Sequence, residues 1–227
     1  MLLLKKILKV FLGLTVFAYG VHLTIAAGIG VAPWDCLGQG IAARTPLSYG
    51  AAMTACSLVI LCADLALKQP IGFGIVIDAL YTGNATQFFN DRCILSNGLT
   101  AGMSGVGAAL AGCAVMLAGL AFMAAGQAVY MGAGLSCGPR DSLTVGLGKR
   151  LPKVPIGLIQ NGILLVVFAA GALLGGSVGI GTLLSTLATG AVMQLVFRLM
   201  RFEPRAVRHQ TFAETLRGPR KERQADR

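Results

Sequence analysis

The 227-residue chain is apolar and basic: 55% of its residues are hydrophobic, 12% are charged, and the formal net charge is +10. Its mean hydropathy is +0.74. Soluble domains carry about 25% charged residues, so this composition excludes an ordinary water-soluble protein. The sequence predicts an all-α protein that crosses a membrane several times.

Apolar stretches of about 20 residues recur along the chain, and each is long enough to cross a ~30 Å hydrocarbon core as a helix. They lie near residues 8–27, 50–67, 71–89, 108–131, 155–174 and 180–200. The first stretch follows three lysines and resembles a signal peptide, but it is longer than the usual apolar run of ~7–15 residues. We therefore expect about six transmembrane helices.

The two halves of the chain share a motif and an ordered series of further matches. Residues 27–40 read AGIGVAPWDCLGQG, and residues 133–146 read AGLSCGPRDSLTVG. The equivalent pairs, at an offset of 106 and then of 107, include Pro33 and Pro139, Asp35 and Asp141, Gly13 and Gly119, Gly20 and Gly126, Gly28 and Gly134, Arg44 and Arg150, Gly50 and Gly157, Gly83 and Gly190, and Gln87 and Gln194. A series that includes Pro, Asp, Arg and Gln indicates an internal duplication.

Each half holds three predicted spans, and an odd number means that the second half enters the membrane the other way up. The predicted organisation is a first three-helix repeat, a second and inverted three-helix repeat, and a basic tail, at residues 1–91, 92–200 and 201–227. If both termini are cytoplasmic, every Lys and Arg except Arg44 and Arg92 falls on the cytoplasmic side, as the positive-inside rule requires. This topology predicts the two motifs on opposite faces, with Trp34 at the outer interface and Arg140 at the inner one.

Each motif is typical of the start of a short helix. Pro33 and Pro139 suit the first helical position, and the aspartate two residues later lies where the positive end of the helix dipole favours a carboxylate. The helices expected near residues 33–45 and 139–150 are under ~20 Å long, which is too short to span. In one interpretation they are interfacial connectors. In the other, their N-termini belong to a central pathway, as in transporters with inverted repeats.

Polar side chains within the predicted spans add further candidates. Asp78, Thr82 and Thr86 share one stripe of the third span, and an ionisable residue inside a membrane usually faces the bundle interior or an aqueous path. The alternative is that Asp78, ten residues past Lys68, is solvated at the cytoplasmic interface. The candidate substrate or pathway residues are Pro33, Asp35, Asp78, Thr82, Pro139 and Asp141.

Other polar residues have simpler expected roles. Gln160 and Asn161 are expected to hydrogen-bond between helices. Asp64 and Lys68 have the spacing of a helical ion pair. His22 is expected to be hydrogen-bonded rather than to carry protons, and the repeated arginines after the short helices are expected to anchor helix ends.

No enzyme signature fits. The GGSVG at residues 175–179 matches a nucleophile-elbow pattern but lacks the strand that this motif requires. The six cysteines show no CxxC pair and are interpreted as packing residues. We therefore expect no catalysis, no cofactor and no metal. Residues 203–227 are expected to be a disordered cytoplasmic tail, whose charge suits anionic lipids rather than nucleic acid.

The stretch GVAPWDCLGQG, the GIGTLL at residues 179–184 and the doubled architecture resemble the YczE/YitT-like family of bacterial integral membrane proteins. The resemblance covers roughly residues 8–198. It implies a multi-pass protein of the bacterial cytoplasmic membrane and supplies no substrate. This sequence departs slightly from a perfect repeat, since residues 72–74 read GFG where residues 179–181 read GIG.

Two classes of function remain. Inverted repeats are common where a site must be reached from both sides in turn, which favours a small transporter or channel. The alternative is a membrane scaffold or regulator of a partner protein, in which the polar residues only pack helices.

Overall fold

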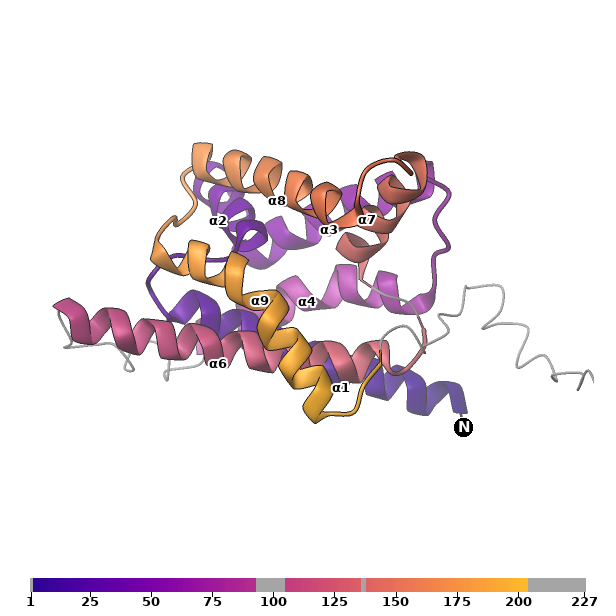
Figure 1. Ribbon diagram of the computed structural model, residues 1–227, viewed down its shortest axis with the longest axis horizontal. Helices are drawn as coiled ribbons and strands as arrows, with labels where there is room; N and C mark the ends of the chain where they lie inside the picture. The colour runs from indigo at the N-terminus through magenta and orange to yellow at the C-terminus, as the bar shows by residue number, and fades with distance from the viewer. Residues whose placement is uncertain (1, 93–104, 136–137, 204–227) are drawn as a thin grey trace, which may run out of the picture.

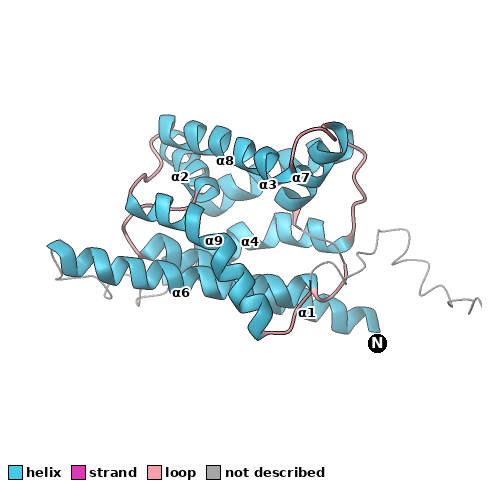
Figure 2. Cartoon of the chain, viewed as in Figure 1, coloured by secondary structure: helices cyan, strands magenta, loops and turns pink. Residues whose placement is uncertain are grey.

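The computed structural model describes residues 2–92, 105–135 and 138–203, and this part of the chain is helical without strands (Figure 2). The predicted all-α class is therefore confirmed. Its helices are α1 (Leu2–Ala26), α2 (Pro33–Arg44), α3 (Tyr49–Ala66), α4 (Phe73–Arg92), α6 (Gly105–Met131), α7 (Pro139–Arg150), α8 (Ile156–Leu173) and α9 (Ile180–Leu199). The predicted tail, apart from its first three residues, lies outside the described residues.

Four of the described helices, α1, α3, α6 and α9, are long and apolar enough to cross a membrane. Helix α8 is apolar but its apolar segment is shorter. Helix α4 is as long as α9, at 20 residues, but it carries more polar side chains, among them Asp78, Asn84 and Gln87. The chain is thus a membrane protein with several apolar helices.

The helices form two layers (Figure 1). In the lower layer α1 packs on α6, with α4 beside α1 and α9 beside α6. In the upper layer α2 packs on α3 and α8, and α7 packs on the same two helices. Between helices of the two layers, the extensive contact is that of α3 along α4. Between its described helices the chain passes from one layer to the other four times, after α1, α3, α6 and α8.

The contact of α1 with α6 depends on glycine. A Cβ placed on Gly20 would lie 2.6 Å from Met123 N, and one on Gly119 would lie 2.8 Å from Gly20 O. Gly13 and Gly126 meet in the same way further along the pair. Because residue numbers fall along α1 while they rise along α6, the two helices run antiparallel. Backbones that approach this closely are typical of membrane helices with small residues at their interface.

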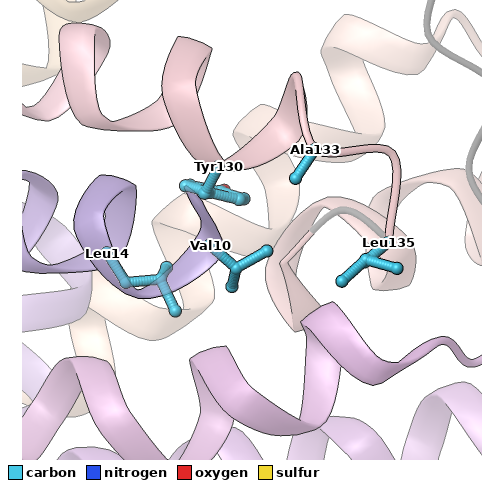
Figure 3. Close-up of a cluster of buried hydrophobic side chains, with 5 residues drawn as sticks. All are labelled: Val10, Leu14, Tyr130, Ala133 and Leu135. Atoms are coloured by element: carbon cyan, nitrogen blue, oxygen red, sulfur yellow. The ribbon is translucent and has the colours of Figure 1, made fainter. Parts of the chain in front are cut away.

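A buried apolar cluster closes one end of this pair (Figure 3). It consists of Val10, Leu14, Tyr130, Ala133 and Leu135. Two of its members, Ala133 and Leu135, belong to the segment that leaves α6 toward α7, so the cluster also fixes where this segment turns into the upper layer.

Equivalent positions of the two halves make equivalent backbone contacts. Gly181 N donates to Ile29 O at 2.7 Å, and Gly74 N donates to Leu135 O at 3.2 Å. Each bond ties the start of α9 or α4 to the segment after α1 or α6. In these segments Gly28 and Gly134 have φ of 68° and 70°, a left-handed conformation that glycine adopts without strain.

The arginines that end the short helices have the predicted anchoring role. Arg44 Nε donates to Leu174 O at the end of α8, and Arg150 Nη2 donates to Ala66 O at the end of α3. A cation at a helix C-terminus satisfies carbonyls that lack an intrahelical partner and complements the negative end of the dipole. Each short helix is thereby fixed to a long helix of the other half.

The predicted ion pair of Asp64 and Lys68 is wrong. Helix α3 ends at Ala66, and Lys68 has a left-handed φ of 55°, so the two side chains do not share a helical face. The Asp64 carboxylate is fully buried and makes no hydrogen bond to another described residue.

We predict that Gly119→Leu lowers the free energy of unfolding by about 1–3 kcal/mol or more, because the new side chain would push α1 away from α6. The measurement is thermal denaturation of the purified protein in detergent. Gly107→Leu is the matched control on the same helix, because no atom lies within 4 Å of a Cβ at that position. An equal loss of stability in both variants would contradict the close-packing account.

Candidate functional site

A cavity of about 400 Å³ lies between the two layers, lined by residues of both halves of the chain. Its wall includes all six candidate residues predicted from the sequence: Pro33, Asp35, Asp78, Thr82, Pro139 and Asp141. The structure therefore brings these residues together. Their role in binding or passage stays a prediction.

The first turns of the two short helices meet in this cavity. The guanidinium carbon of Arg140 lies 4.8 Å from the centre of the Trp34 ring, a cation–π contact between α7 and α2. From this contact the two helices run to opposite ends of the molecule, where Arg44 and Arg150 hold them (Figure 1). The prediction that the motifs lie on opposite faces is wrong, because only the C-terminal ends of these helices are far apart.

Asp35 is the most deeply buried carboxylate of the cavity wall, with 3% of its surface exposed. It accepts a hydrogen bond of 2.9 Å from Tyr49 Oη on α3. Burial raises the pKa of the Asp35 carboxyl, and the charge of Arg140 and the Tyr49 hydrogen bond offset part of this rise.

Asp78 reaches the cavity from α4 and lies against the start of α7. Thr82 Oγ1 donates a hydrogen bond to Asp78 Oδ1, one helical turn away. A Cβ placed on Gly138, the N-cap of α7, would lie only 2.7 Å from Asp78 Oδ2. The carboxylate therefore sits at the positive end of the α7 dipole. It lines the cavity rather than standing beside Lys68.

Asp141 completes the group of three carboxylates. Burial, and secondly the charge of Asp78, raise the pKa of Asp141 to about 6, while the charge of Arg140 lowers it. Among the described residues that line the cavity, Arg140 is the one with a basic side chain. Its single positive charge offsets part of the negative charge of the group.

Sequence reasoning missed several residues of the site. Tyr49 donates a hydrogen bond to a carboxylate, and the charge of Arg140 acts on the carboxylates of the cavity. The sequence did offer a signal for Arg140, because it lies within the repeated motif, between Pro139 and Asp141. Gln160 and Asn161 were expected to join helices. They line the cavity instead, are exposed, and make no hydrogen bond to another described residue.

Other polar residues behave more simply. The hydroxyls of Ser185, Thr186 and Thr189 bond to carbonyls of their own helix. His22 is hydrogen-bonded as predicted, with Nδ1 2.7 Å from Asn90 Oδ1. The described residues contain no cluster of three or more side chains that could hold a metal ion.

The fold and the site define a polytopic helical membrane protein with a polar cavity inside it. Residues 4–198 match the model of a family described as a family of unknown function (DUF6198), and the chain belongs to this family. It is 27% identical over 186 residues to the uncharacterized membrane protein YczE of Bacillus subtilis, with 81% of each chain covered. The predicted YczE-like membership is thus confirmed.

A second relative is similar over a slightly longer stretch. An uncharacterized protein of Haemophilus influenzae is 28% identical over 200 residues, which cover 86% of this chain and 85% of the relative. No solved structure matches the chain.

We predict that Arg140→Gln shifts the titration of the cavity to higher pH. The charge of Arg140 lowers the pKa of both Asp35 and Asp141, so its removal makes these carboxyls lose their protons at higher pH. The chain has a single tryptophan, and its fluorescence as a function of pH reports on the cavity. In the unchanged protein we expect a transition near pH 6, from Asp141.

The control is Arg92→Gln, because that guanidinium lies over Phe88, at 5.7 Å, and not in the cavity wall. It should leave the fluorescence transition where it is. If Arg140→Gln also leaves it unchanged, Arg140 does not set the protonation of the site.

Proposed function

We propose that the protein is a small transporter or channel of the bacterial inner membrane, built from two inverted three-helix repeats with both termini in the cytoplasm. The observation that carries this proposal is the cavity between the layers, which the N-terminal turns of both short helices enter from opposite directions. Discontinuous helices that expose their N-termini at a central site are the hallmark of transporters with inverted repeats.

The contacts support two equivalent halves of opposite orientation. Helices α1 and α6 pack antiparallel through equivalent glycines. Gly13 meets Gly126, the equivalent of Gly20, and Gly20 meets Gly119, the equivalent of Gly13, as a two-fold axis requires. The bond of Gly74 with Leu135 repeats that of Gly181 with Ile29. If α4 and α8 are counted as membrane spans, each half contributes three transmembrane helices.

The chemistry of the cavity supports a pathway rather than simple packing. Three carboxylates, one guanidinium and the uncapped N–H groups of two helices gather among the described residues of this cavity wall, within a bundle of largely apolar helices. Charged groups inside a membrane are costly and usually line an aqueous path or a binding site. Irregular backbone at that depth is stable only where it faces protein or such a cavity.

The test is chemical accessibility. Thr82 and Thr189 are equivalent residues of the two halves, and both line the cavity. We predict that Thr82→Cys and Thr189→Cys, each in a protein without its native cysteines, react with a membrane-impermeant thiol reagent added from either side of the membrane. The measurement is labelling in right-side-out and inverted vesicles.

Exposed positions just after the C-terminal ends of the two short helices provide the controls. Thr45→Cys follows α2 and Lys153→Cys follows α7, and each should react from one side only. If both cavity thiols react from a single side alone, the transport proposal fails, and a scaffold or regulator of a partner protein is the better account.

A further inference from the structure

Two helix hairpins border the cavity, and each connects the two layers. Helices α3 and α4 are joined by residues 67–72, and α8 and α9 by residues 174–179. The joined ends are fixed to the lower layer by the backbone bonds of Gly74 and Gly181. The other ends of the hairpins are therefore the ends that can separate.

The α3–α4 hairpin is closed at its free end. A Cβ on Gly50 would lie 2.9 Å from Gly83 O, and one on Gly83 would lie 2.8 Å from Gly50 O. Gly50 N donates to Gln87 Oε1 at 3.2 Å, which satisfies a first-turn N–H that has no partner within α3. One turn further, Asn84 Nδ2 donates to Thr54 Oγ1 at 3.2 Å.

The α8–α9 hairpin is open at the equivalent place. No atom lies within 4 Å of a Cβ on Gly157 or Gly190, the equivalents of Gly50 and Gly83. Gln194, the equivalent of Gln87, is exposed and makes no hydrogen bond to another described residue. Figure 1 shows α8 and α9 diverging from their shared loop. The two hairpins thus share two glycines and a glutamine at equivalent positions, in two different arrangements.

The layers provide the coupling between the hairpins. Helices α3 and α8 belong to the upper layer, where α2 and α7 each pack on both of them, whereas α4 and α9 belong to the lower layer. A rotation of one layer on the other that brings α8 toward α9 therefore lifts α3 from α4. All four crossings between layers contain a left-handed residue, namely Gly28, Lys68, Gly134 and Gly175.

We propose that the upper layer rocks on the lower layer, so that α8 closes on α9 through Gly157, Gly190 and Gln194 while α3 opens from α4. The inference rests on the proposed function and assigns its two gates. The structure represents the state in which the α3–α4 gate is shut and the α8–α9 gate is open. Glycine at positions 157 and 190, where nothing now touches it, is explained by the contact made in the other state.

The test uses two equivalent cysteine pairs in a protein without its native cysteines. Thr54→Cys with Asn84→Cys probes the α3–α4 gate, where the two native side chains are in contact. Asn161→Cys with Ala191→Cys occupies the equivalent positions of α8 and α9. We expect each pair to form a disulfide on oxidation in native membranes, since both states are visited.

The four-cysteine variant tests the alternation. After oxidation and alkylation, the intact mass of each molecule should show one disulfide and two alkylated thiols. Leu165→Cys with Leu187→Cys is the collision control, because these leucines are 68% and 73% exposed on the same two helices. This pair should not cross-link.

A single substitution gives an independent measurement. Gly190→Leu has free space in the present state, so it should leave the abundance of the protein and the 54–84 cross-link unchanged. It should slow the 161–191 cross-link about tenfold or more, because an added side chain would obstruct the closed contact.

Absence of the 161–191 disulfide while 54–84 forms would overturn the gate, even if the cavity thiols react from both sides. Two disulfides in one molecule would overturn the alternation, and absence of both would remove the closed contact on which it depends. Conversely, the cross-links could alternate while the cavity thiols react from one side only. That result would contradict transport but would still support the alternation of the two gates.

Discussion

The close antiparallel contact of α1 and α6 is the constraint on which the rest of the structure depends. Gly20 and Gly119 place backbone against backbone, so any larger side chain would separate the helices. Because α4 and α9 pack on the flanks of this pair, its spacing sets the width of the lower layer. The segments that leave α1 and α6 then carry the chain upward at fixed points, and the short helices begin there.

The start of the short helices inside the bundle resolves an electrostatic problem. A carboxylate in an apolar bundle is costly unless positive charge lies nearby. Asp35 has Tyr49 and Arg140 as partners, and Asp78 has Thr82 and the first turn of α7. The contact of Trp34 with Arg140 holds the two short helices together at this point, so the same guanidinium serves packing and charge balance.

Much of this arrangement could be predicted from the sequence, and the failures have physical reasons. The all-α class and the two short helices follow from local patterns, and the pattern that starts each short helix occurs twice. The meeting of Trp34 with Arg140 does not follow from them, because a charge count along the chain assigns loops to sides and cannot show that two helices begin side by side inside the bundle. The ion pair of Lys68 was predicted wrongly because a left-handed turn follows Ala66. A lysine at this position does not indicate such a turn, as a glycine would. Gln160 was expected to hydrogen-bond between helices, but it lines the cavity. The separation of α8 from α9 depends on tertiary packing, which a local sequence pattern does not show.

The exchange of contacts between halves has a consequence for the independence of each half. Helix α2 packs on α8 of the second half, and α7 packs on α3 of the first. A protein consisting of one half alone would keep the contact of its short helix with α3 or α8, but it would leave the other side of that helix uncovered and its Arg44 or Arg150 without a carbonyl to bind. Each half is therefore expected to be stable only against the other half.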